Sequence, residues 1–104
     1  MLTQKKAIEL LKNEMPTLAG TYGVKKIAIF GSYAKGKQTK KSDIDILIDL
    51  KKPLGLNFIE LAERLEQILG TKVDVATFDC FKRSFRNARY KHIAEGIKKS
   101  LIYV

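Results

Sequence analysis

The chain has 104 residues, with a hydrophobic fraction of 45%, a charged fraction of 30% and a formal net charge of +9. This length leaves room for one hydrophobic core, so we expect a single domain over residues 1–104. The composition excludes a disordered chain, and no apolar run approaches the roughly 18 residues of a membrane span. The start of the chain lacks the apolar segment of a signal peptide, and Cys80 is the single cysteine, so we expect a cytoplasmic protein. The positive charge favours partners that are polyanions, such as nucleotides, nucleic acid or acidic proteins.

The first part of the chain has the periodicity of a helix. Apolar residues recur at spacings of three and four from Ala7 to Leu18, and Thr3 is placed to cap the start. Residues 25–30 then form a short, largely apolar run that ends at Gly31. This run predicts a buried strand followed by a tight turn.

Residues 43–49 form the clearest strand pattern in the sequence. Alternation places Ile44, Ile46 and Ile48 on one face, and on the other Asp43, Asp45, Leu47 and Asp49. One face is therefore expected to join the core, while the other presents carboxylates.

The second half of the chain predicts helix, strand and helix in turn. Asn57 is placed to cap a helix with Glu60 at the capping-box position, and Gly70 ends it. A third strand follows over residues 72–77, and a basic helix over about 84–99. This order predicts an α/β (α+β) fold, a small mixed β-sheet with helices packed on it.

The last helix allows two interpretations. Basic side chains interleaved with aromatic ones, as in residues 81–90, can bind single-stranded RNA. Phe81, Phe85 and Ile93 are also spaced to form the apolar stripe that packs a helix on a core, and we favour that reading. Residues 101–104 are apolar and are expected to dock against the sheet or a partner.

Asp43 and Asp45 are candidate metal ligands. Residues two apart on a strand share a face, with backbone positions roughly 7 Å apart. Carboxylates that converge on one point repel each other unless a cation lies between them. Oxygen ligands favour Mg²⁺ or Mn²⁺, and paired metals of this kind serve phosphoryl and nucleotidyl transfer. The alternative for an isolated Asp-x-Asp is a solvent-facing pair without a function.

Gly31 and Ser32 add a candidate phosphate-binding turn. Glycine at the end of a strand lets backbone N–H groups approach an anion closely, and serine adds a hydroxyl donor. The pair follows one strand, and ten residues later Asp43 opens the next. Together the four positions are far more specific than either pair alone.

Gly31-Ser32, ten intervening residues and Asp43-Ile44-Asp45 resemble the signature of the polymerase-β-like nucleotidyltransferase superfamily. The fuller strings, residues 31–36 and 42–45, resemble its minimal members, the MNT proteins. Many of these are antitoxins paired with a helical HEPN ribonuclease toxin. The resemblance implies a polymerase-β-like nucleotidyltransferase core.

The resemblance also implies roles for individual residues. Gly31 and Ser32 would bind the phosphates of ATP, and Asp43 and Asp45 would hold Mg²⁺, with Mn²⁺ as a substitute. Asp74 matches the third carboxylate, which completes the metal site and activates the acceptor hydroxyl. Strand alternation agrees, because it places Val73 and Val75 in the core and Asp74 on the open face. Lys35 stands where many relatives carry arginine, so it can meet a phosphate as a point charge without the bidentate fork.

The leading hypothesis for function is therefore an Mg²⁺-dependent antitoxin that transfers AMP from ATP to a tyrosine of a partner HEPN toxin. A chain of 104 residues has no room for a domain that holds the acceptor, so the partner must bring it, in a hetero-oligomer. Two alternatives stay open. One is a non-catalytic, nucleotide-binding antitoxin that neutralises its toxin by direct binding, and the other is a basic RNA-binding module.

Overall fold

The computed structural model describes residues 2–39 and 41–104, without the side chains of Ser84, Phe85 and Ala88. The elements follow the predicted alternation and give the expected α+β fold. In chain order they are α1 (Gln4–Tyr22), β1 (Val24–Phe30), α2 (Gly31–Ala34), β2 (Ile44–Leu50), α3 (Asn57–Leu69), β3 (Val73–Thr77), α4 (Phe78–Arg86), α5 (Ala88–Ser100) and β4 (Ile102–Tyr103).

The sheet is mixed and has the strand order β3-β2-β1-β4. β2 runs antiparallel to β1 and parallel to β3, while β4 runs antiparallel to β1. The parallel pair is possible because α3 crosses over between β2 and β3. Residues 101–104 were expected to dock either against the sheet or against a partner. The structure shows the first, because β4 pairs with β1.

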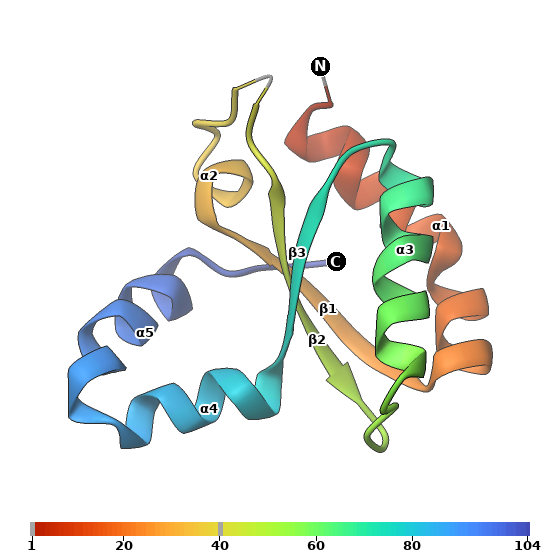
Figure 1. The fold of residues 1–104 in the computed structure, drawn as a ribbon. Helices are drawn as coiled ribbons and strands as arrows, with labels where there is room; N and C mark the ends of the chain where they lie inside the picture. Colours follow the sequence, from red (N-terminus) through yellow and green to blue (C-terminus); the bar gives the residue numbers. More distant parts are fainter. Residues whose placement is uncertain (1, 40) are drawn as a thin grey trace.

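Helices α1 and α3 cover one face of the sheet, and the main core lies between them and the strands (Figure 1). Ile44, Ile46 and Ile48 are fully buried there, as the alternation predicted. Leu47 points to the opposite face, yet its side chain is only 1% exposed. Helix α4 packs against β2 and covers Leu47, whereas Asp43 just before the strand is exposed.

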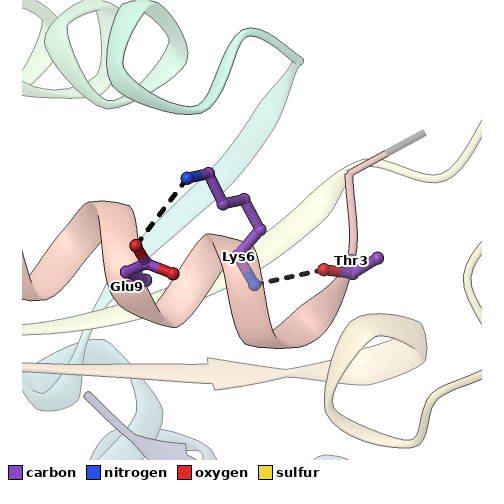
Figure 2. Close-up of polar contacts among 3 residues, drawn as sticks. All are labelled: Thr3, Lys6 and Glu9. Carbon is purple, nitrogen blue, oxygen red and sulfur yellow. Dashed lines mark hydrogen bonds and ion pairs between the residues drawn. The ribbon is translucent and has the colours of Figure 1, made fainter.

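Helix α1 begins after its predicted cap, Thr3, and ends at a glycine. Thr3 Oγ1 accepts a hydrogen bond from the backbone N–H of Lys6 at 3.1 Å, and Lys6 forms an ion pair with Glu9 at 3.7 Å (Figure 2). Gly23 ends the helix in the left-handed conformation, with φ of 71°. Its N–H returns to the carbonyl of Ala19 at 3.0 Å. These caps satisfy backbone groups that a helix cannot satisfy internally.

Two helix boundaries differ from those predicted. Asn57 is the first residue of α3 and not its cap, and the capping position, Leu56, makes no side-chain hydrogen bond to the helix. The single basic helix expected over residues 84–99 is two helices, α4 and α5. Thr77 caps α4 and Asn87 caps α5, because their side chains accept hydrogen bonds from nearby backbone N–H groups. A capping residue in extended conformation stops one helix and starts the next.

The predicted apolar stripe of the last helix is also only partly correct. Ile93 is 60% exposed, because α5 packs mainly against α4 and leaves part of its surface uncovered. Phe81 is partly buried, and the side chain of Phe85 lies outside the described residues. Across residues 2–39 and 41–104, no helix combines the length and the apolar character needed to cross a membrane.

Candidate active site

Gly31 forms the turn that ends β1. Its φ of 72° lies in the left-handed region, where a side chain is strained. A Cβ atom built on Gly31 would collide with the carboxylate of Asp45. Backbone conformation and the close approach of Asp45 therefore each require glycine at position 31. The predicted phosphate-binding turn is thus in direct contact with a predicted metal ligand.

Ser32 lies in the short helix α2 that follows this turn. The backbone N–H of Lys35 donates to the carbonyl of Gly31 at 3.2 Å, and that of Lys37 to the carbonyl of Ser32 at 2.9 Å. The side chain of Tyr33 is only 2% exposed and fixes α2 to the core. The turn is thus folded back on itself, with Ser32 partly exposed and Lys35 exposed beside it.

A contact from α1 also supports α2. Gln4 Nε2 donates to the carbonyl of Tyr33 at 2.8 Å and to that of Ala34 at 3.0 Å. Sequence reasoning missed this residue. A glutamine in the first turn of a helix carries no local signal, and its partners lie 29 and 30 residues away.

The loop before β2 places Asp43. The N–H of Thr39 donates to Ser42 Oγ at 2.9 Å, and the N–H of Ser42 returns to the carbonyl of Thr39 at 3.0 Å. Next, the N–H of Ile44 donates to the carbonyl of Lys72 at 3.1 Å, which ties the start of β2 to the segment before β3. Asp43 is therefore held between a closed turn and the first bond of the sheet. It lies just before β2, which begins one residue later than the predicted strand.

Asp45 lies at the centre of the site. It pairs in register with Phe30, the last residue of β1, and on the other side with Asp74 of β3. Asp45 is partly buried, whereas Asp43 and Asp74 are exposed. Burial raises the pKa of Asp45, and the negative charges of Asp74 and then Asp43 raise it further. The structure thus brings together Gly31, the two predicted metal ligands and the predicted third carboxylate.

The donor set fits a hard divalent cation. Its oxygen atoms are the ligands that Mg²⁺ and Mn²⁺ prefer, and a cation would relieve the repulsion that raises the pKa of Asp45. Within the described residues, no three such side chains are already gathered closely enough to enclose a metal ion. The side chains of Asp43, Asp45 and Asp74 would have to turn toward one point when the cation binds.

Two other aspartates lie apart from this group. Asp49 is at the far end of β2 and meets Lys25 at 4.0 Å. Asp79 lies in the first turn of α4 and, with Asp49 and Arg83, lines a hollow of about 200 Å³ near that end of the strand. Both therefore lie away from the group formed by Asp43, Asp45 and Asp74.

The sequence matches the model of the family described as nucleotidyltransferase domain over residues 8–104. This chain belongs to that family. A protein of Methanocaldococcus jannaschii with the provisional name protein adenylyltransferase is 41% identical, and the alignment covers both chains completely. Protein adenylyltransferase MntA of Thermococcus cleftensis is 36% identical over all of this chain and 98% of its own length. The chain is thus a nucleotidyltransferase of the protein adenylyltransferase type, and the resemblance to the minimal nucleotidyltransferases is confirmed.

Solved structures agree with this assignment. One minimal nucleotidyltransferase of 22% identity superposes with a TM-score of 0.68 over 97% of this chain and 95% of its own, which shows the shared fold. A toxin–antitoxin structure with AMP-PNP is 34% identical and superposes with a TM-score of 0.52 over 73% of this chain. This chain covers 57% of that solved chain. The nucleotide analogue in a related structure supports a nucleoside triphosphate as substrate.

Proposed function

We propose that this nucleotidyltransferase is an antitoxin that transfers AMP from ATP to a tyrosine hydroxyl of a HEPN toxin. The observation that carries the proposal is the position of Asp45, whose carboxylate lies against Gly31 and beside Asp74. A phosphate held at the Gly31 turn would therefore lie next to the carboxylates. The relatives named adenylyltransferases and the toxin–antitoxin structure with AMP-PNP support the nature of the reaction and of the partner.

Different residues of the site would bind the phosphates, hold the metal ion and accept the proton. Backbone N–H groups at Gly31 and the hydroxyl of Ser32 would hold phosphate oxygens, and Lys35 would add a positive charge. Asp43, Asp45 and Asp74 would hold Mg²⁺, which supplies charge neutralisation at the phosphates when it is bound. Asp74 would also accept the proton of the tyrosine hydroxyl. The tyrosine oxygen then forms a bond to the α-phosphorus while the bond to the pyrophosphate oxygen breaks, and pyrophosphate leaves.

The acceptor would approach across an apolar and basic surface next to this site. We define the α4–α5 surface as the exposed side chains of Tyr90 and Ile93 together with a hollow of about 300 Å³ between α4, the end of α5 and β4, which is lined by Phe78, Phe81, Lys82, Lys98, Leu101 and Tyr103. Helix α5 also contacts α2, which carries the phosphate-binding turn (Figure 1). Lysine and arginine outnumber aspartate and glutamate in both helices. An acidic, amphipathic segment of the toxin is the complementary partner.

The proposal is tested by incubating the protein with ATP labelled at the α-phosphate, Mg²⁺ and the HEPN toxin encoded beside it. Label should appear on the toxin, and Asp43→Ala or Asp45→Ala should reduce the rate by about a hundredfold or more. Asp49→Ala is the matched control, since Asp49 shares the strand and face of Asp45 but pairs with Lys25. An unlabelled toxin, or equal labelling by the Asp45→Ala variant, would refute the transfer.

A non-catalytic antitoxin is distinguished in the same experiment by measuring toxin activity. Binding at the α4–α5 surface would need none of the three carboxylates, so this surface serves either function. Neutralisation that persists in the Asp43→Ala/Asp45→Ala variant, without any label on the toxin, would assign inhibition to binding alone. An RNA-binding module would instead show RNA affinity that falls steeply with salt.

A further inference from the structure

The phosphate-binding turn belongs to a helix that is too short to hold its own shape. Helix α2 spans only Gly31–Ala34. One turn of helix is an unfavourable nucleus, because several backbone angles are fixed for few hydrogen bonds. The direction of the N–H groups at its start, and the place of Ser32, therefore depend on anchors from elsewhere in the fold.

Gln4 is such an anchor at the opposite end of α2. Its Nε2 donates to the carbonyls of Tyr33 and Ala34, at 2.8 and 3.0 Å. Both partners are acceptors, so the amide nitrogen of Gln4 must be the atom that faces them. The last carbonyls of a helix have no partner within the helix. Gln4 donates to the carbonyl of Ala34 and adds a second, shorter bond to that of Tyr33, which also accepts from the N–H of Gly36 at 3.4 Å.

The start of α1 holds Gln4 in place for this task. Gln4 is the first residue of the helix and follows directly after its cap, Thr3. The hydroxyl of Thr3 fixes the first turn by accepting from the N–H of Lys6 (Figure 2). The N–H of Ala7 adds a bond of 2.9 Å to the carbonyl of Thr3. A capped, rigid helix end thus presents the amide of Gln4 to α2.

We infer that Gln4 is a positioning residue for the nucleotide, which clamps the carboxyl end of α2 so that Gly31 and Ser32 keep the orientation that phosphate binding needs. The inference rests on the proposed nucleotide site, since Gln4 contacts α2 and not the reacting groups. Loss of the clamp should weaken the binding of nucleotide and leave the chemical step almost unchanged once nucleotide is saturating.

The test uses Gln4→Met, which keeps the length of the side chain, removes the donor and adds no charge near the phosphates. AMP-PNP is titrated by calorimetry in Mg²⁺ without any partner protein, so the readout does not require transfer. Its Kd should rise about three- to tenfold, as expected for the loss of one or two hydrogen bonds. In the transfer assay KM for ATP should rise by a similar factor, with kcat within about twofold of the unmodified protein.

Tyr22→Phe is the matched control from the other end of the same helix. It removes one hydrogen bond, from the Tyr22 hydroxyl to Glu60 Oε1 at 3.1 Å, and so loosens α1 away from α2. It should lower the melting temperature without changing Kd for AMP-PNP. An unchanged Kd in Gln4→Met, or an equal rise in Tyr22→Phe, would overturn the inference. If the unmodified protein binds AMP-PNP but labels no toxin, only the proposed transfer fails; if it binds no AMP-PNP, both proposals fail.

Discussion

Asp45 on β2 and Asp74 on β3 are paired in register across parallel strands, so that two carboxylates meet on one face of the sheet. Without a cation this arrangement opposes folding, because burial and the neighbouring charges raise the pKa of Asp45. Residues that lower the stability of the fold in this way are typical of functional sites.

We expect Asp45→Asn to raise the melting temperature at pH 7 in metal-free buffer. An aspartate with a raised pKa contributes stability below its unfolded pKa of about 3.9, and loses that contribution as pH rises through the folded pKa. The increase in melting temperature caused by Asp45→Asn should therefore be present at pH 7 and become smaller as the pH falls toward 4. Thermal melts at both pH values measure it, and Asp49→Asn should show no gain, since it loses an ion pair. A lower melting temperature of Asp45→Asn at pH 7 would contradict the prediction.

Gly31→Ala should abolish nucleotide binding, whereas Gly70→Ala should leave it intact. Both glycines have positive φ, 72° and 69°, so either substitution costs about 1–2 kcal/mol of backbone strain. Only at Gly31 does the new Cβ also meet Asp45, while nothing lies within 4 Å at Gly70. The comparison of AMP-PNP titrations with melting curves separates the two effects. Equal loss of affinity in both variants would assign it to strain alone.

Ile93→Glu should weaken capture of the toxin by at least about tenfold, as expected when a charge enters an apolar contact. Ile59→Glu is a closely matched control, because the two side chains are 60% and 59% exposed. Ile59 lies on α3 among acidic residues, away from the α4–α5 surface. Surface plasmon resonance should show weaker toxin binding for Ile93→Glu and unchanged toxin binding for Ile59→Glu. Both variants should bind AMP-PNP as the unmodified protein does. If Ile59→Glu is the variant that loses the toxin, the docking surface is on α3.

Removal of divalent cations should stop the transfer. With EDTA the labelling of the toxin should fall to background, and added Mg²⁺ or Mn²⁺ should restore it, because the carboxylates provide only oxygen ligands. Stability should respond to Mg²⁺ as well, with a rise in melting temperature that Asp45→Asn reduces. Labelling that continues in EDTA would show that the carboxylates act without a metal.

The parts of the site that sequence predicted are those with a local pattern. Gly31, Ser32, Asp43 and Asp45 stand at fixed spacing around two strand ends, and Asp74 follows from alternation within its own strand. The structure brings these positions together. The contact of Asp45 with Gly31 required knowledge of how β1 and β2 pair, which no local pattern provides.

The features that were missed depend on contacts distant in sequence or on competing local signals. Gln4 looks like any polar residue of a helix until α2 is placed beside it. Leu47 is buried because α4 folds over β2. The break at Asn87 did have a signal, since asparagine is a good helix cap, but the continuous basic pattern around it favoured one long helix.

The strand order β3-β2-β1-β4 places Asp74 on an outer strand. The Gly31 turn follows β1 and Asp45 lies on β2, and both of these strands have a neighbour on each side. In the described sheet β3, which carries the proposed base, has a neighbour on one side only. A different partner bound beside β3 would therefore present a different acceptor hydroxyl, while the proposed nucleotide site at Gly31 and Asp45 stays the same. Such a division would let one small scaffold acquire new targets during evolution by exchanging partners, while its chemistry stays constant.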